Sequence, residues 1–417
     1  MGNLSKIKTV YAQEILDSRG NPTLEATVIL ESGACGTACV PSGASCGIHE
    51  ALELRDGGDR FDGMGALRAV ESVNCTIGKK LCGLSPIQKN VDAVMRELDG
   101  TEDKSKLGAN SILGVSLACA KAASAELKLP LFRYIGGISA KKLPVPLMNV
   151  LNGGAHAGNN LDTQEFMIVP MGFKTFSEAL RAGCEVYKAL GRLLRADGKS
   201  TCVGDEGGYA PDLSDDSEAL DYLIRAIEEA GYTKDEIKLS LDAAVSEWFD
   251  GETYRMPKSG VVYTPEQLCR KWEEMCERYT IFSIEDGMAE DDFSGWQKLT
   301  RTLGKKIRLV GDDLFVTNEK RLREGVKMEM ANSILIKPNQ IGTLTETLDV
   351  IRFAKEHSYS PIISHRSGET EDVTIADIAV ATNAGYIKCG APCRTERTAK
   401  YNRLLRIEMM LSDDAIF

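Results

Sequence analysis

The amino-acid sequence predicts an α/β protein in which a TIM-like β/α barrel follows a smaller N-terminal α+β domain. Three observations support this prediction. The chain has 417 residues, whereas single hydrophobic cores stop growing at roughly 250 to 300 residues. Strand patterns and then helical patterns fill the first part of the chain, and apolar runs alternate with amphipathic helices over the rest. We therefore expect two unequal domains, residues 1–140 and residues 141–417.

The N-terminal part begins with two alternating segments, KIKTVYAQEIL and TLEATVIL, within residues 5–40. They are joined by DSRGNP at residues 17–22, which has the chemistry of a hairpin turn. From about residue 49 to residue 135 the pattern becomes helical, and strands followed by helices predict an α+β unit. Residues 141–146 contain two lysines and two prolines, and we expect a linker there.

The second domain carries helix start and stop signals between its apolar runs. Residues 264–267 form a capping box with proline at the first helical position, and residues 343–346 form another. Four side chains at helical spacing predict a buried helix face: Leu268, Trp272, Met275 and Tyr279. Three glycines are expected to end helices: Gly231, Gly304 and Gly325.

Charged or polar side chains stand at the ends of the apolar runs in this domain. They recur at intervals of roughly 25 to 40 residues, the length of one strand plus one helix. A single acidic residue after a strand is more often a helix cap, but chance capping does not explain carboxylates followed by cations. We therefore expect these groups to converge at the carboxyl-terminal mouth of a barrel. They are Asp205, Glu206, Asp242, Glu285, Asp312, Lys337, His365, Arg366 and Lys388.

Three carboxylates on consecutive runs predict a magnesium site. Asp242, Glu285 and Asp312 offer hard oxygen ligands without His or Cys, which suits Mg²⁺ and disfavours zinc. Lys337 and Lys388 follow on later runs. A lysine near bound cations has a lowered pKa and can act as a base, whereas the alternative role is a salt-bridge partner of the acids. The residues alone leave open which lysine has which role.

The run SHRSGETED offers the planar fork of Arg366 and hydroxyl groups, with His365 and Ser367 beside it, and predicts phosphate binding. The expected substrate is a phosphorylated carboxylate. A proton next to a carboxylate is only weakly acidic, so its removal requires metal ions and a cation to stabilise the dianion. Glu206 and Glu165 are the candidates for a general acid that protonates a departing hydroxyl.

Ten motifs extend from about residue 5 to about residue 410: DSRGNPTLE, PSGAS, NGGAHAGN, QEFM, VGDEGGYAP, SIEDG, VGDDLFVTN, SILIKPNQIGTLTET, ISHRSGETED and AKYNRLLRIE. In these motifs the chain resembles the enolase (phosphopyruvate hydratase) family. The resemblance implies a lyase that reversibly dehydrates 2-phospho-D-glycerate to phosphoenolpyruvate in glycolysis and gluconeogenesis. It also implies two Mg²⁺ ions per active site, the second arriving with substrate.

The resemblance assigns a role to each site residue. Lys337 would accept the proton, Glu206 would donate one, and Glu165 would help to bind the leaving hydroxyl. The first Mg²⁺ would be held by Asp242, Glu285 and Asp312, and the second would be reached by Ser45 of PSGAS when its loop closes. Substrate contacts are implied for His156, Gln164, Arg366, Ser367 and Lys388, with His365 close by. Without the resemblance, PSGAS is only a Gly/Ser loop and His156 a turn residue.

Two cysteines depart from the family pattern. Cys46 and Cys389 stand where the family commonly has Thr. Two thiols near the site predict sensitivity to oxidation or alkylation.

The family dimer typically uses two ion pairs. Glu25 and Arg406 preserve one of them, whereas Gln13 and Met409 replace the other with neutral residues. We expect a homo-oligomer, a dimer or an octamer, with weakened salt dependence.

Composition excludes several classes of partner. The net charge is −11 and no basic run interrupts the acidic balance, so no nucleic-acid partner is expected. No uncharged apolar stretch of about 18 residues predicts a membrane span. The 12 scattered cysteines lack metal-site spacing and indicate reduced thiols in a cytoplasmic protein.

Two other functions are compatible with parts of the sequence. A related barrel enzyme could remove a proton from a carboxylate that lacks phosphate, but Arg366 and Ser367 argue against it. A structural or surface-binding protein could keep the fold and lose catalysis, yet Lys337, Glu206 and the predicted metal ligands are all present.

Overall fold

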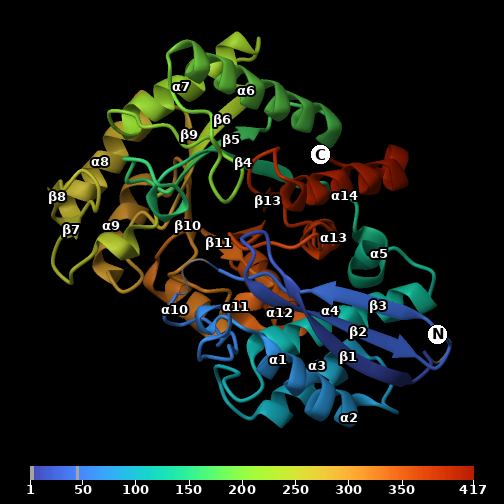
Figure 1. The fold of residues 1–417 in the computed structure, drawn as a ribbon. Coiled ribbons are helices and arrows are strands. Elements are labelled where there is room, and N and C mark those ends of the chain that lie inside the picture. The colour runs from blue at the N-terminus through green and yellow to red at the C-terminus, as the bar shows by residue number, and fades with distance from the viewer. Residues whose placement is uncertain (1–3, 44–46) are drawn as a thin grey trace.

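A computed structural model describes residues 4–43 and 47–417 of the chain (Figure 1). The N-terminal part begins with an antiparallel sheet of three strands: β1 (Ile7–Leu16), β2 (Pro22–Leu30) and β3 (Cys35–Cys39). The predicted hairpin turn is present, since Asp17 donates its N–H to the carbonyl of Asn21 at 2.8 Å and Gly20 adopts φ +78°. The third strand was not anticipated.

The helices beside this sheet are α1 (Leu67–Glu71), α2 (Gly78–Leu81), α3 (Gln88–Asp99), α4 (Ala109–Glu126) and α5 (Leu131–Gly136). Helix α4 lies against the sheet (Figure 1). The approach is so close that a Cβ on Gly36 would come within 2.2 Å of the Ala118 carbonyl oxygen. The expectation of helix from about residue 49 was wrong for residues 49–59, which have no helix; Gly57 and Gly58 there adopt positive φ, which disfavours a right-handed helix.

The rest of the chain contains a closed barrel of eight strands, which confirms the predicted fold class. In spatial order the strands are β10 (Arg308–Gly311), β11 (Ser333–Ile336), β12 (Ser360–Ser364), β13 (Tyr386–Lys388), β4 (Val145–Asn152), β5 (Glu165–Pro170), β6 (Ile237–Asp242) and β9 (Ile281–Glu285). Six buried apolar side chains from these strands form a cluster of their own, as a filled barrel interior requires: Leu147, Met167, Val169, Val310, Leu335 and Ile362.

Strand β5 runs antiparallel to both of its neighbours, β4 and β6, whereas the remaining strand pairs are parallel. A loop joins β4 to β5 in place of a helix, so the barrel departs from a strict strand–helix repeat at this point. The reversal has a direct consequence for the site. Glu165 begins β5 but pairs with Asp242, which ends β6, so both reach the same mouth of the barrel.

Helices surround the barrel (Figure 1). They are α6 (Phe176–Ala196), α7 (Asp216–Glu229), α8 (Pro265–Arg278), α9 (Phe293–Leu303), α10 (Glu319–Met328), α11 (Pro338–Ile341), α12 (Leu344–Glu356), α13 (Thr374–Ala381) and α14 (Thr395–Leu411). A small hairpin, β7 (Tyr254–Arg255) with β8 (Val262–Tyr263), precedes α8. No helix within the described ranges is long and apolar enough to cross a membrane.

The predicted helix signals were largely correct. The capping box at Thr264 is formed, and the four side chains of the expected α8 stripe are buried. Thr343 caps α12 by accepting the N–H of Glu346, while Gly231 and Gly304 stand at helix ends. Gly325 does not: it lies inside α10, where a Cβ would meet the Phe315 ring at 2.3 Å.

The predicted linker at residues 141–146 was also wrong in part. Strand β4 begins at Val145 and includes the buried Pro146. Pro146 lies opposite Ile387 of β13, in a parallel pairing of three residues. The division into domains at residues 140 and 141 stays a prediction.

Candidate active site

Most of the predicted site residues of the barrel line a cavity of about 290 Å³ at its mouth; Glu285 and Asp205 are not in its lining. The strand ends contribute Asp242, Lys388 and Ser364, and the residue after β11 is Lys337. Gly47 and Glu50 from the N-terminal part line the same cavity. Its other charged or polar lining groups include His156, Gln164, Glu165, Glu206, Asp286, Asp312, Asp313, His365, Arg366 and Ser367.

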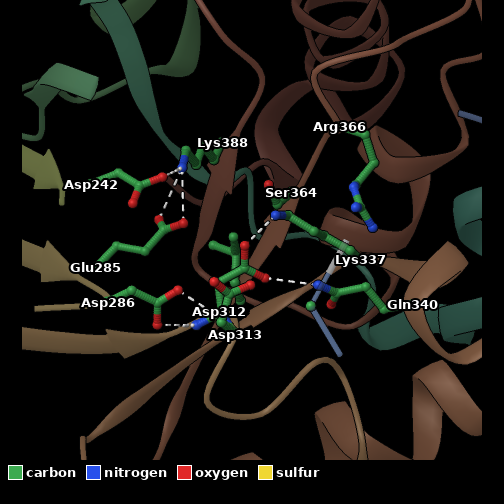
Figure 2. Close-up of polar contacts among 12 residues, drawn as sticks. Asp242, Glu285, Asp286, Asp312, Asp313, Lys337, Gln340, Ser364, Arg366 and Lys388 are labelled. Atoms are coloured by element: carbon green, nitrogen blue, oxygen red, sulfur yellow. Dashed lines mark hydrogen bonds and ion pairs between the residues drawn. The ribbon is translucent and has the colours of Figure 1, made fainter. Parts of the chain in front are cut away.

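Lys388 is the centre of one half of this cavity (Figure 2). Its ammonium nitrogen lies 3.0 Å from Asp242 Oδ2, 3.0 Å from each Glu285 carboxylate oxygen and 3.1 Å from Glu165 Oε2. Burial lowers the pKa of Lys388, but the surrounding carboxylates outweigh it and raise that pKa well above its usual range. Burial and the neighbouring Asp242 likewise raise the pKa of Glu285 well above normal. Lys388 therefore neutralises a cluster of carboxylates that repel one another.

Lys337 faces a single carboxylate of the same cavity (Figure 2). Its ammonium group contacts Asp312, which also accepts a hydrogen bond from Gln340 Nε2 at 2.9 Å. Burial lowers the pKa of Lys337, yet Asp312 more than offsets this and the net pKa is raised. The lowered pKa that the sequence predicts for a lysine beside bound cations stays a prediction, because the raised pKa of Lys337 applies to the chain without metal ions.

Two carboxylates that the sequence reasoning missed lie next to the predicted ligands. Asp286 accepts the backbone N–H groups of Asp312 at 3.0 Å and Asp313 at 2.9 Å. Ligand oxygens of Asp286, Asp312 and Asp313 lie within 4.8 Å of one another. Burial raises the pKa of Asp313 to about 7. The signal was present in SIEDG and VGDDL, where each predicted ligand is followed by a second acid.

The three predicted ligands stand at or next to the ends of neighbouring barrel strands, β6, β9 and β10. Asp312 groups with Asp286 and Asp313, whereas Lys388 holds Asp242 and Glu285, which do not group with Asp312 within 4.8 Å. All of these groups are carboxylates, which suit a hard divalent cation, and burial and then the charge of Asp242 raise the pKa of Glu285. A cation held there competes with the ammonium groups of Lys337 and Lys388.

Glu206 lines the predicted cavity but reaches it from a loop and not from the end of a strand. The run TCVG before it forms only an isolated bridge between Val203 and Tyr209, so Glu206 stands on a turn in the loop between α6 and α7. The four residues before Asp205 are too few to build a barrel strand. The loop that contains them nevertheless brings Glu206 into the cavity at the mouth of the barrel. Asn149 Nδ2 donates to Glu206 Oε2 at 3.0 Å and thereby fixes this carboxylate inside the barrel.

Glu206 and Glu165 form a buried pair with two histidines. His156 Nδ1 lies 3.5 Å from Glu165 Oε1 and 3.7 Å from Glu206 Oε1, and His365 Nε2 lies 3.3 Å from Glu206 Oε2. Burial and the charge of Glu206 raise the pKa of Glu165 well above normal. Burial also raises the pKa of Glu206, but the neighbouring His365, His156 and Arg397 outweigh it and hold that pKa well below normal. The two carboxyl groups of the pair therefore differ in proton affinity.

Arg366 is paired with a residue from the N-terminal part. Its Nη1 lies 2.8 Å from Glu50 Oε2, and its Nη2 donates to Glu50 Oε1 at 3.2 Å. Ser367 and Gln164 are buried in the cavity wall. Glu50 was missed because GIHEALELRD has no strand or motif chemistry that points to a barrel 300 residues away.

The remaining predicted residues have different outcomes. Ser45 and Cys46 lie outside the described residues. Cys389 is fully buried, and burial raises the pKa of its thiol, so the reactive thiolate is disfavoured. The structure gives no support to thiol sensitivity at Cys389.

These features define a class of protein: a barrel enzyme with a carboxylate cluster able to hold a metal and acid–base groups in the same cavity. Family models agree across the chain. The model described as "Enolase, C-terminal TIM barrel domain" matches residues 140–417, and "Enolase, N-terminal domain" matches residues 7–135. The chain belongs to the enolase family, whose chemistry is that of a lyase acting by dehydration and typically using Mg²⁺.

Proposed function

We propose that the protein dehydrates 2-phosphoglycerate reversibly to phosphoenolpyruvate. One observation carries the proposal: an ammonium group with one partner, a buried pair of glutamate side chains and an arginine all line one cavity beside a carboxylate cluster. Removal of a proton next to a carboxylate, departure of a hydroxyl and phosphate binding need those groups together.

The base is Lys337. Its pKa is held up by Asp312, so this pKa falls when the charge of Asp312 is shared with another cation, and the neutral amine that accepts a proton becomes more populated. Mg²⁺ held by Asp242, Glu285 and Asp312, and a second ion reached by Ser45, would supply positive charge for the substrate dianion. Lys388 adds a fixed positive charge from the opposite wall, where its three carboxylate partners keep it protonated.

The acid is the pair of Glu165 and Glu206. The family pattern favours Glu206 as donor and Glu165 as the group that binds the leaving hydroxyl. The pKa of Glu165 is raised and that of Glu206 is lowered, so the two carboxyl groups differ in proton affinity, and mutating each one separately tests its role. The same cavity is also lined by His156, His365 and Gln164.

Arg366 and Ser367 bind the substrate phosphate. In the free protein the guanidinium of Arg366 donates hydrogen bonds to the carboxylate of Glu50. An entering phosphate group competes with this carboxylate for the planar fork.

The test follows the ultraviolet absorbance of the enol phosphate after 2-phosphoglycerate and Mg²⁺ are added, with EDTA as the control. We expect a signal that EDTA abolishes. Folded protein that gives no signal would refute the proposal. Turnover of an unphosphorylated hydroxy acid in its place would favour the related barrel enzyme.

We also propose a cytoplasmic homo-oligomer, dimer or octamer, with the small domain at residues 1–140. Arg406 and Met409 are exposed on α14, and Gln13 donates to Glu25 Oε1 at 3.0 Å within the chain. These side chains are therefore present on the surface for a partner. Light scattering gives the mass that distinguishes monomer, dimer and octamer.

A further inference from the structure

Arg397 of α14 is fully buried beneath the loops that carry two proposed site residues. Its Nη1 donates to the Arg366 carbonyl oxygen at 2.5 Å, and its Nη2 donates to the carbonyl oxygens of Ser367 at 2.6 Å and Asp205 at 3.1 Å. Arg366 and Ser367 follow β12, whereas Asp205 precedes Glu206 in the loop between α6 and α7. One guanidinium thus joins the proposed phosphate loop to the loop of the proposed proton donor.

The same guanidinium determines the tautomer of His365. Arg397 Nη1 lies 2.6 Å from His365 Nδ1. An arginine side chain only donates hydrogen bonds and does not lose its proton in proteins. His365 Nδ1 must therefore be the acceptor, and a neutral ring then carries its hydrogen on Nε2, the nitrogen 3.3 Å from Glu206 Oε2.

We propose that Arg397 is a positioning residue that holds His365 as the neutral Nε2–H tautomer, keeps this nitrogen 3.3 Å from Glu206 Oε2, and fixes the backbone at residues 366–367. The effect on turnover rests on the proposed function; the tautomer does not. Since His365 Nδ1 is blocked by a permanent cation, the ring stays uncharged and its N–H stays on the side of Glu206.

The charged groups around His365 support a neutral ring. Burial, with a smaller contribution from Arg397, lowers the pKa of His365 to about 4 against the opposing effect of Glu206. Glu369 also faces the ring, but its Oε2 lies 2.8 Å from Lys400 of α14. Lys388 of β13 meets His365 only through its carbonyl, which accepts the His365 N–H at 2.9 Å.

The first experiment measures the tautomer directly. The full-length protein has four histidines, so ¹⁵N-histidine NMR with His365→Gln as the assignment variant resolves this ring. We expect a neutral Nε2–H form at pH 7 that stays uncharged down to about pH 5. An Nδ1–H tautomer, or a charged ring at pH 7, would overturn the proposal whether or not the protein dehydrates 2-phosphoglycerate.

The second experiment replaces Arg397. Arg397→Met should release His365 Nδ1, mix the tautomers, and lower kcat by roughly 10- to 100-fold, the usual cost of losing an orienting partner. Arg397→Lys keeps the charge but not the fork, and should lie between this variant and the native protein. The matched control is Arg403→Met, which removes an arginine of α14 whose partner is Asp377.

The control should retain kcat and the Nε2–H signal. Full kcat in folded Arg397→Met, or lost kcat with an unchanged tautomer, would contradict the positioning role. If Arg397→Met does not fold, Arg397→Lys and the native tautomer decide the question.

Discussion

The surroundings of the two active-site lysines differ in a way that separates their roles. Lys388 is 3% exposed and touches three carboxylates, whereas Lys337 is 14% exposed and touches one. A lysine held by three carboxylates keeps its proton, but one held by a single carboxylate can lose it once that partner is engaged elsewhere. The comparison teaches that the number of partners, rather than burial alone, distinguishes a fixed cation from a base.

The largest expected effect is on turnover by Lys337→Ala. Loss of a general base typically costs 10²–10⁴-fold, and we expect about 10⁴-fold here together with loss of proton exchange at the substrate α-carbon. Exchange is followed by NMR in deuterated water. Persistent exchange in this variant would transfer the base role to another group.

Next in size is the stability of the metal-free protein. Lys388→Met leaves buried carboxylates without their cation, and breaking a buried pair costs about 3–5 kcal/mol of unfolding free energy. Lys337→Met, with one partner and more solvent, should cost less. Urea unfolding in EDTA measures the unfolding free energy of both variants. Equal decreases would contradict the proposed difference between the two lysines.

Glu165→Gln removes one partner of Lys388 and leaves the contact of Lys337 intact. We expect turnover to fall by roughly 10²-fold, the lower end for a general acid, while α-proton exchange continues. Glu206→Gln is the parallel variant. Rates of turnover and exchange are compared in the same samples, and a loss of exchange in either variant would indicate that the acid pair also governs Lys337.

The smallest effect concerns pH and Asp313. Its pKa of about 7 lies above that of an unfolded carboxyl, near 4. The folded chain therefore binds this proton more tightly, and the group costs stability as pH rises from about 4 to about 7. Asp313→Asn should remove this cost.

Because Asp313 is partly exposed, we expect the metal-free variant to be more stable than the native protein by on the order of 2 kcal/mol at pH 8. The difference should vanish at pH 4. Denaturant unfolding at both pH values measures it, and a gap that grows toward low pH would reverse the assigned direction.

The sequence predicted the barrel and most of its mouth because a strand end is a local signal. Asp242, Glu285 and Lys388 each end a strand of the barrel as expected. The sequence could not predict the reversal of β5, because this antiparallel strand is buried along its whole length and therefore lacks the alternation of apolar and polar residues that usually marks antiparallel strands. Glu206 was placed at the mouth for the wrong reason: its loop brings it there, not a strand.

Other residues depend on tertiary structure that no local pattern encodes. Glu50 pairs with Arg366, which is far away in the chain. Arg397 donates hydrogen bonds to backbone carbonyls, and such contacts leave no pattern in the sequence. Pro146 was misread because proline is usually excluded from central strands, yet the short parallel pairing of β13 accommodates it.

The reversed β5 strand also governs how the protein tolerates changes in length. Glu165 enters the mouth as the first residue of its strand, directly after the loop of residues 153–164. Residues added in that loop leave the pairing of Glu165 with Asp242 intact but displace His156, whose Nδ1 lies 3.5 Å from Glu165 Oε1. A single residue inserted within β5 turns alternate side chains to the opposite face. A change of length in either segment should therefore disturb the mouth of the barrel, through His156 in one case and through Glu165 in the other.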